Sequence, residues 1–158
     1  MKKQIPLFVI LSLLIASQPA FAQHISTLWG VTQKGGTDDF GSLYHYKPSS
    51  ANYTLDHNFP AINPGTNPSE DLIDAGNGKF YGITMLGGAY GVGTIFEWDP
   101  VTNVHSKKID MEASEGSRPS GSLTKFGSKY YGMTIDGGSN NYGVIFEWDD
   151  IGKRSTNR

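Results

Sequence analysis

A motif that occurs three times limits the possible folds of this chain more than any other feature. Each copy has a short apolar segment around a glycine, then a glycine pair two residues later. Five residues after the pair, a further glycine opens a second apolar run. The offset is 52 residues from Trp29 to Tyr81 and 50 from Tyr81 to Tyr131. Repetition at this period indicates an array of structurally equivalent units. The glycines at the repeated positions are Gly35, Gly36, Gly41, Gly82, Gly87, Gly88, Gly93, Gly132, Gly137, Gly138 and Gly143.

Residues 72–111 predict four short antiparallel strands, at about residues 72–75, 79–85, 94–98 and 104–111. Gly76-Asn77-Gly78 predicts a hairpin turn between the first two, because these residues accept positive φ easily. Pro100 ends the third strand, since proline has no N–H for a sheet ladder. Four strands in about 50 residues match one blade of a kelch-type propeller. The predicted fold is all-β, an array of propeller-like four-stranded antiparallel blades.

The array is predicted to be an incomplete, open ring. The blade repeats occupy residues 23–148, with units at 28–79, 80–129 and 130–148. Residues 149–158 form a polar tail, expected to be disordered and to lack a fourth strand. About 2.5–3 blades fall short of the usual minimum of about four. We therefore expect part of a longer propeller, or a chain that self-associates through open blade edges. A small open stack that is stable by itself is the alternative.

The first 22 residues have the three-part pattern of a secretory signal peptide cleaved after Ala22. Two lysines precede an apolar run at residues 5–16, and Ala20-Phe21-Ala22 supplies small residues at the cleavage site. The run is shorter than the ~20 residues of a membrane anchor, which is the alternative. The protein is therefore expected outside the inner membrane, in the periplasm, on the cell surface or in the medium, with no membrane span in the mature chain.

Charge and composition exclude several kinds of partner and chemistry. Removing residues 1–22 takes away two lysines and no acids, so 13 basic and 15 acidic residues become 11 and 15, a net charge of −4. A mildly acidic chain without a basic cluster is not expected to bind nucleic acid. The chain has no cysteine, which excludes disulfides and thiol chemistry.

No catalytic constellation is found, and the sequence predicts no catalytic residue, metal or cofactor. The adjacent acids Asp38-Asp39, Glu70-Asp71 and Asp149-Asp150 point to opposite faces if they lie in strands. Glu97 and Glu147 hold the same repeat position, which favours a structural role such as pairing between blades. The four histidines lack metal-ligand spacing.

Aromatic residues fall into two groups. Those alternating along the third strand of each unit predict a core between blades; they are Tyr44, Tyr46, Phe96, Trp98, Phe146 and Trp148. The loops after the glycine pairs, residues 37–40, 89–92 and 139–142, should gather on one side of the molecule. Rings there could stack on a sugar that neighbouring polar groups hydrogen-bond. The candidate binding residues are Asp38, Asp39, Phe40, Tyr90, Asn140, Asn141 and Tyr142.

The combined motif resembles the Gloeo/Verruco tandem repeat. Tyr81-Gly82-Ile83-Thr84, Gly87-Gly88 and Gly93-Thr94-Ile95-Phe96 carry the likeness, with Asn67-Pro68 and Arg118-Pro119 where the family has an Asn-Pro element. The resemblance implies large exported bacterial proteins, often with a C-terminal anchoring or sorting module, and no established activity. Few repeats and no such module are seen here. A looser likeness to kelch blades rests on the glycine pair and residues 98–103.

Together these features predict an exported, non-enzymatic binding or surface-scaffold module whose partner is a glycan or another surface protein. One alternative is a fragment of a propeller-type hydrolase or lyase acting on carbohydrate, with its catalytic residues in missing blades. Another is a gene remnant without function.

Overall fold

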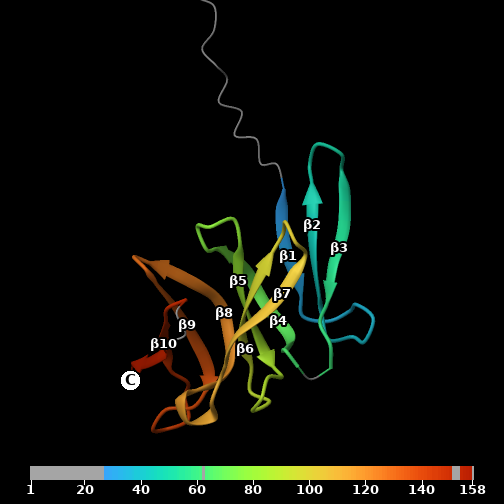
Figure 1. Cartoon of the computed structure of the whole chain (residues 1–158). Coiled ribbons are helices and arrows are strands. Elements are labelled where there is room, and N and C mark those ends of the chain that lie inside the picture. Colours follow the sequence, from blue (N-terminus) through green and yellow to red (C-terminus); the bar gives the residue numbers. More distant parts are fainter. Residues whose placement is uncertain (1–26, 62, 151–153, 158) are drawn as a thin grey trace, which may run out of the picture.

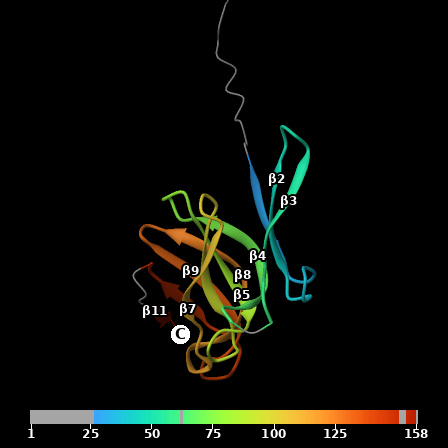
Figure 2. The same ribbon diagram turned by 45° about the vertical axis from the view of Figure 1, so that its right-hand side comes forward.

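The computed structural model describes residues 27–61, 63–150 and 154–157, so the predicted signal peptide lies outside the described residues. It contains three antiparallel sheets, one for each repeat. Figures 1 and 2 show the second sheet between the other two. No helix among the described residues is long and apolar enough to cross a membrane.

The strands follow the chain in simple up-and-down order within each sheet. The first sheet has the order β1-β2-β3, the second β4-β5-β6-β7 and the third β11-β10-β9-β8. A single turn of 3-10 helix, η1 (Ala113–Glu115), precedes the third sheet. The strands are β1 (Leu28–Thr32), β2 (Ser42–Lys47), β3 (Asn52–Asn58), β4 (Thr66–Asp74), β5 (Phe80–Leu86), β6 (Thr94–Asp99), β7 (Val104–Asp110), β8 (Ser117–Phe126), β9 (Lys129–Asp136), β10 (Ile145–Trp148) and β11 (Arg154–Asn157). The all-β, open array of antiparallel blades is confirmed.

Two strands differ from the prediction. β4 begins at Thr66, six residues earlier than expected, because the Asn-Pro element joins the edge of the sheet, where proline is tolerated. A bulge between Ser69 and Ile73, with Glu70 at a φ of 60°, separates its two paired parts. The prediction that no fourth strand follows Trp148 is wrong. β11 pairs with β10, since an outer edge strand needs only backbone hydrogen bonds to join.

Successive side chains in a strand point to opposite faces of the sheet, so each sheet has two faces. We call the face that carries Phe96 and Trp98 in the second sheet, and the equivalent face elsewhere, the upstream face. The opposite face, which carries Tyr81, Ile83 and Ile95, is the downstream face. In the second sheet the upstream face contacts the first sheet and the downstream face contacts the third.

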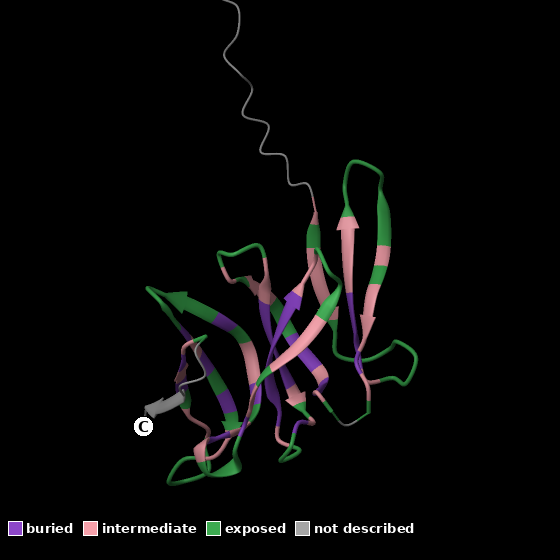
Figure 3. Cartoon of the chain, viewed as in Figure 1, coloured by how far each residue is buried: buried purple, intermediate pink, exposed green. Residues whose placement is uncertain are grey.

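The core therefore consists of two layers, one at each junction between sheets. In the first layer the downstream face of the first sheet, including Leu43 and Phe59, packs on Phe96 and Trp98. In the second, the downstream face of the second sheet packs on Leu123, Tyr130, Phe146 and Trp148. The predicted core between blades is thus present for the Phe-Trp pairs. Figure 3 shows the buried positions concentrated in the central sheet.

Tyr44 and Tyr46 are the exception among the predicted core aromatics. They lie on the upstream face of the first sheet and are only half-buried. No preceding sheet occurs among the residues that the structure describes, so nothing there covers this face.

The strand glycine Gly82 makes room for a side chain of the neighbouring strand rather than for a second backbone. It lies opposite Phe96 on the neighbouring strand, and a Cβ at this position would overlap the Phe96 ring. Gly132 has the same relation to Phe146. At Gly30, a Cβ would come within 2.8 Å of the Tyr44 hydroxyl oxygen. The glycine in each unit thus provides the space in which a cross-strand aromatic ring lies.

Neighbouring sheets are also joined through the Asn-Pro element. The backbone N–H of Asn67 donates to the carbonyl of Phe40 at 2.8 Å, and that of Arg118 donates to Val92 at 3.0 Å. A Cβ on Gly93 would lie 2.7 Å from Cδ of Pro119, so the proline ring rests directly on the glycine. Each of these elements therefore attaches its sheet to the glycine loop of the preceding sheet.

Candidate functional site

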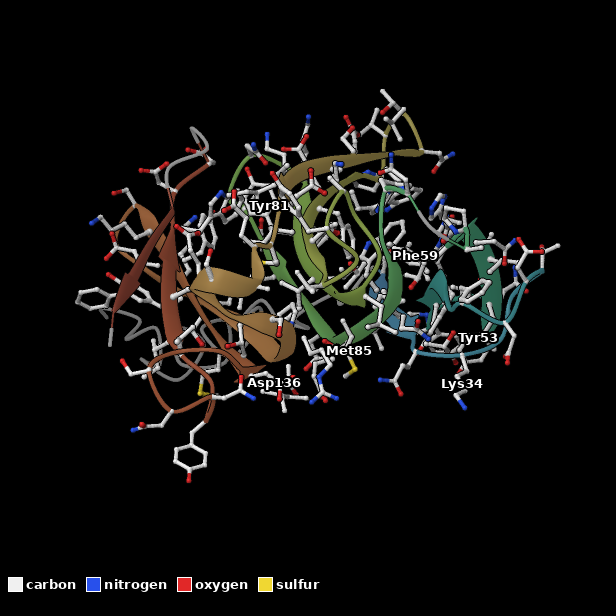
Figure 4. All side chains as sticks on the ribbon, turned by 90° about the horizontal axis from the view of Figure 1, so that it is seen from below. Lys34, Tyr53, Phe59, Tyr81, Met85 and Asp136 are labelled. Atoms are coloured by element: carbon white, nitrogen blue, oxygen red, sulfur yellow. The ribbon has the colours of Figure 1, made fainter. Side chains whose placement is uncertain are left out.

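The three glycine loops, residues 35–41, 87–93 and 137–143, lie at one end of the sheets, because they connect equivalent pairs of strands: β1 to β2, β5 to β6 and β9 to β10. Figure 4 looks onto this end, where Lys34, Met85 and Asp136 mark the approach to each loop. One hydrogen bond closes every loop, from the last glycine N–H to the first glycine carbonyl. Its length is 3.0 Å in the first and second loops and 3.1 Å in the third. The loops thus share a backbone frame.

Two of the candidate binding residues stabilise that frame. Asp39 and Asn141 have φ values of 63° and 57°, and Gly91 occupies the same position with a φ of 72°. The Asp39 side chain accepts a hydrogen bond from the Gly35 N–H at 2.8 Å, and Asn141 accepts one from Gly137 at 2.8 Å. The sequence indicates this role because Asp39 and Asn141 align with Gly91 in the repeat. Asn and Asp, like glycine, tolerate the left-handed backbone region.

The other candidates divide into two positions. Asp38, Tyr90 and Asn140 are equivalent and exposed, and Tyr90 is 61% exposed. Phe40 and Tyr142 share the position before the last glycine. Phe40 is half-buried, whereas Tyr142 is 89% exposed. The structure therefore brings the loops to one end but does not bring the candidate side chains into mutual contact.

A polar pocket of about 350 Å³ lies between the first two sheets near this end. It is lined by Val31, Gln33, Pro68, Ser69, Glu70, Asp71 and Met85. The Ser69 hydroxyl is buried without a hydrogen-bond partner among the described residues. Glu70 and Asp71, considered above as a carboxylate pair, are both exposed. None of the candidate loop residues lines this pocket.

The paired acids Glu97 and Glu147 form ion pairs within their own sheets, so the expected pairing between blades is wrong. Glu97 lies 2.8 Å from the ammonium group of Lys79, the residue directly before β5, and Glu147 is paired with Lys129 at the equivalent position. Burial raises the pKa of Glu97, but Lys79 and Lys108 outweigh this effect and hold it below its usual range. A carboxylate that stays ionised beside two ammonium groups is poorly suited to donate a proton.

The match to a known family follows from the same repeats. The family model for the Gloeobacter/Verrucomicrobia repeat matches residues 16–157, which is more than half of the chain. The chain belongs to this family. The search of curated proteins returns no match.

Among solved structures, the Gloeobacter/Verrucomicrobia repeat chain is similar to TolB from Acinetobacter baumannii. The identity is 16% and the TM-score is 0.47. The match covers 73% of this chain and 26% of the TolB chain, so the chain spans about a quarter of that protein's length.

The signature residues of the Gloeobacter/Verrucomicrobia repeat hold the sheets in place in this structure. The hydroxyl oxygen of Thr84, which follows Tyr81-Gly82-Ile83, accepts the N–H of Thr94 at 3.0 Å. Thr134 accepts the N–H of Val144 at 3.0 Å in the same way. The strand glycines make room for aromatic rings, and the glycine pairs lie in the loops between strands. The residues of the motif therefore have structural roles.

No group of three or more histidine, aspartate or glutamate side chains that could hold a metal occurs in the described part of the repeat chain. Two histidines instead pack against each other at the junction of the first two sheets. The rings of His57 and His105 are stacked, with centroids 4.6 Å apart and an interplanar angle of 11°. The Nε2 atoms of both are buried without a hydrogen-bond partner in this part of the chain.

This histidine pair is expected to make the fold sensitive to acid. Burial, followed by the charge of His57, lowers the pKa of His105 from 6.5 to about 3, and burial lowers that of His57. Between pH 6.5 and about 3 the unfolded chain therefore binds protons that the folded chain does not, so stability is complete above pH 6.5 and is lost as the pH falls. Since one unit of pKa difference corresponds to about 1.4 kcal/mol, we expect His105 to account for roughly 2–4 kcal/mol of this loss.

Urea unfolding of the wild type and of a His105→Phe variant, at pH 7.5 and pH 4.5, measures this effect. The variant keeps an aromatic ring but cannot be protonated, so its free energy of unfolding should fall less between the two pH values. Carboxylates titrate equally in both proteins and cancel in the comparison. Equal losses in the two proteins would rule out His105 as the source.

Proposed function

We propose that this chain is an exported, non-enzymatic repeat module that binds a ligand at its glycine-loop end. The single observation that supports this is the contrast between the common frame of the loops and their different exposed tips. Tyr90 in one loop and Tyr142 in another are 61% and 89% exposed, and neither makes a side-chain hydrogen bond to a described residue. Rigid sheets that present variable loops are a common arrangement for binding. Export rests on the pattern of residues 1–22.

The ligand class that these tips fit best is a glycan. A tyrosine ring offers an apolar surface on which a sugar ring can stack, together with a polar hydroxyl. The side chains of Asp38 and Asn140, at the position equivalent to Tyr90, supply hydrogen-bond acceptors and an amide donor. Because Asp39 and Asn141 are used inside the loops, we assign binding to Asp38, Tyr90, Asn140 and Tyr142.

A catalytic role is not supported by the acids at the two repeated strand positions, which are held in ion pairs. Glu97 contacts Lys79 and Lys108, and Glu147 contacts Lys129 and the Tyr131 hydroxyl. A glycosidase needs two carboxyl groups with separated pKa values facing one bond. The proposal is therefore a protein that binds a carbohydrate and releases it unchanged.

A polysaccharide and glycan binding screen with the full chain tests this proposal, followed by alanine substitution of Tyr90 and Tyr142. We expect each substitution to weaken binding about three- to tenfold, since an aromatic contact contributes about 0.5–1.5 kcal/mol. Val101→Ala is the matched control, because Val101 is 87% exposed in the β6–β7 turn at the opposite end of the sheet. Unchanged affinity in both tyrosine variants would contradict the assignment, and shortened glycan products would show an enzyme instead.

A further inference from the structure

Two sheet faces at opposite ends of the array are uncovered among the described residues. On the upstream face of the first sheet, Leu28, Tyr53 and Leu55 are 48%, 69% and 57% exposed. On the downstream face of the third sheet, Met133 and Ile145 are 57% and 54% exposed. Large exposed apolar surfaces of this kind mark sites of protein association.

The repeat relation shows how completely such a face can be covered. Ile145 occupies the position of Ile95, which is fully buried, and Met133 occupies the position of Ile83, which is 1% exposed. The central residues are buried because the upstream face of the third sheet lies on them. The downstream face of the third sheet thus carries apolar residues at the same positions as the downstream face of the second sheet, which the third sheet covers.

Both junctions inside the chain join unlike faces. The upstream face of the second sheet covers the downstream face of the first, and the upstream face of the third covers the downstream face of the second. Ring contacts between equivalent positions cross each junction. The ring centroids of Trp29 and Trp98 are 6.1 Å apart, and those of Tyr81 and Trp148 are 4.8 Å apart. Of the two uncovered faces, one is an upstream face and the other is a downstream face. They are therefore the two kinds of face that pack together at both junctions.

We infer that a second copy of this chain docks head to tail, with the upstream face of its first sheet on the downstream face of the third sheet. The repeat alignment places Tyr131 where Trp29 and Tyr81 lie, and Tyr46 where Trp98 and Trp148 lie. Tyr46 of one copy therefore packs against Tyr131 of the other. Two copies combine six sheets, within the propeller range of about four to eight, and a ring that closes leaves neither face exposed.

The contact is heterologous, and this makes it testable with two substitutions. Leu55→Glu places a carboxylate on the upstream face, and Ile145→Glu places one on the downstream face. Both residues are more than half exposed in the single chain, so the fold tolerates the change. An unpaired carboxylate cannot be buried without a large penalty, so we expect either substitution to weaken association about a hundredfold or more.

Sedimentation equilibrium of the full chain measures the outcome, with circular dichroism to confirm that each variant is folded. The wild type should associate, each variant alone should be monomeric, and the Val101→Glu control should behave like the wild type. A mixture of the two variants should form a 1:1 complex, because each contributes the face that the other has lost.

Three results would overturn this inference. A monomeric wild type would show that the faces do not bind a second copy. An effect of only one of the two substitutions would indicate a symmetric contact between like faces. Association that survives both substitutions would place the contact elsewhere, for example in residues outside the described ranges. None of these outcomes bears on glycan binding, since the proposed binding loops lie at the end of the sheets and not on these faces.

Discussion

Replacing Gly82 by alanine is expected to lower the free energy of unfolding by about 3 kcal/mol. The added methyl group would overlap the ring of Phe96 on the adjacent strand and approach Leu72 to 2.8 Å. Phe96 is completely buried at the junction of the first two sheets, so its ring cannot move aside without disturbing Phe59 and Trp98. Overpacking of a closed core typically costs about 1–3 kcal/mol and occasionally more.

Gly30→Ala is the matched control for this prediction. The two glycines are equivalent in the repeat, and Tyr44 takes the place of Phe96. Tyr44 lies on the uncovered upstream face of the first sheet and is only half-buried, so its ring can turn away at little cost. Urea unfolding, at a protein concentration low enough to keep the chain monomeric, should show a loss below about 1 kcal/mol, the level expected where the structure can relax. Equal losses in the two variants would mean that the closed junction does not restrain the ring.

A second substitution separates crowding from other effects of the alanine. In a Gly82→Ala/Phe96→Leu double variant, the smaller leucine leaves room for the new methyl group. We expect the double variant to be more stable than the sum of the two single losses predicts, because residues in contact are not additive. Strict additivity would contradict the account of Gly82 as space for the Phe96 ring.

Much of the fold follows from the repeat. Alternation along strands such as Thr94–Asp99 predicts which side chains share a face, and repetition of Phe96-Glu97-Trp98 at Phe146-Glu147-Trp148 predicts that the face packs between sheets. The alternation alone does not reveal which neighbour lies on which face. It also does not reveal that a polar tail supplies β11, since an edge strand depends on backbone hydrogen bonds.

The candidate site was predicted less completely than the fold. The order of strands places all three glycine loops at one end, which the repeat predicts. The inward rotation of the Asp39 and Asn141 side chains depends on their left-handed backbone, a property of the folded loop. Likewise, Glu97 pairs with Lys79 because Lys79 directly precedes β5 and Glu97 lies on the neighbouring strand β6, so the contact requires the register of these two strands. Composition and spacing do not supply that register.

The largest contrast between equivalent positions is expected at Ile95 and Ile145. Both open the apolar run of the third strand in their units, and both lie on the downstream face. Ile95 is fully buried against the third sheet, whereas Ile145 is 54% exposed. Truncating a buried isoleucine to alanine costs about 2–5 kcal/mol, because burial is lost and a cavity remains. Truncating an exposed one costs little.

The difference in unfolding free energy between Ile95→Ala and Ile145→Ala therefore tests the stacking of the sheets most directly. Urea unfolding at a protein concentration low enough to keep the chain monomeric makes the comparison independent of self-association. We predict a loss of about 2–5 kcal/mol for Ile95→Ala and less than about 1 kcal/mol for Ile145→Ala. Losses of the same size at the two positions would show that the third sheet does not lie on the second, and would contradict the stacked arrangement.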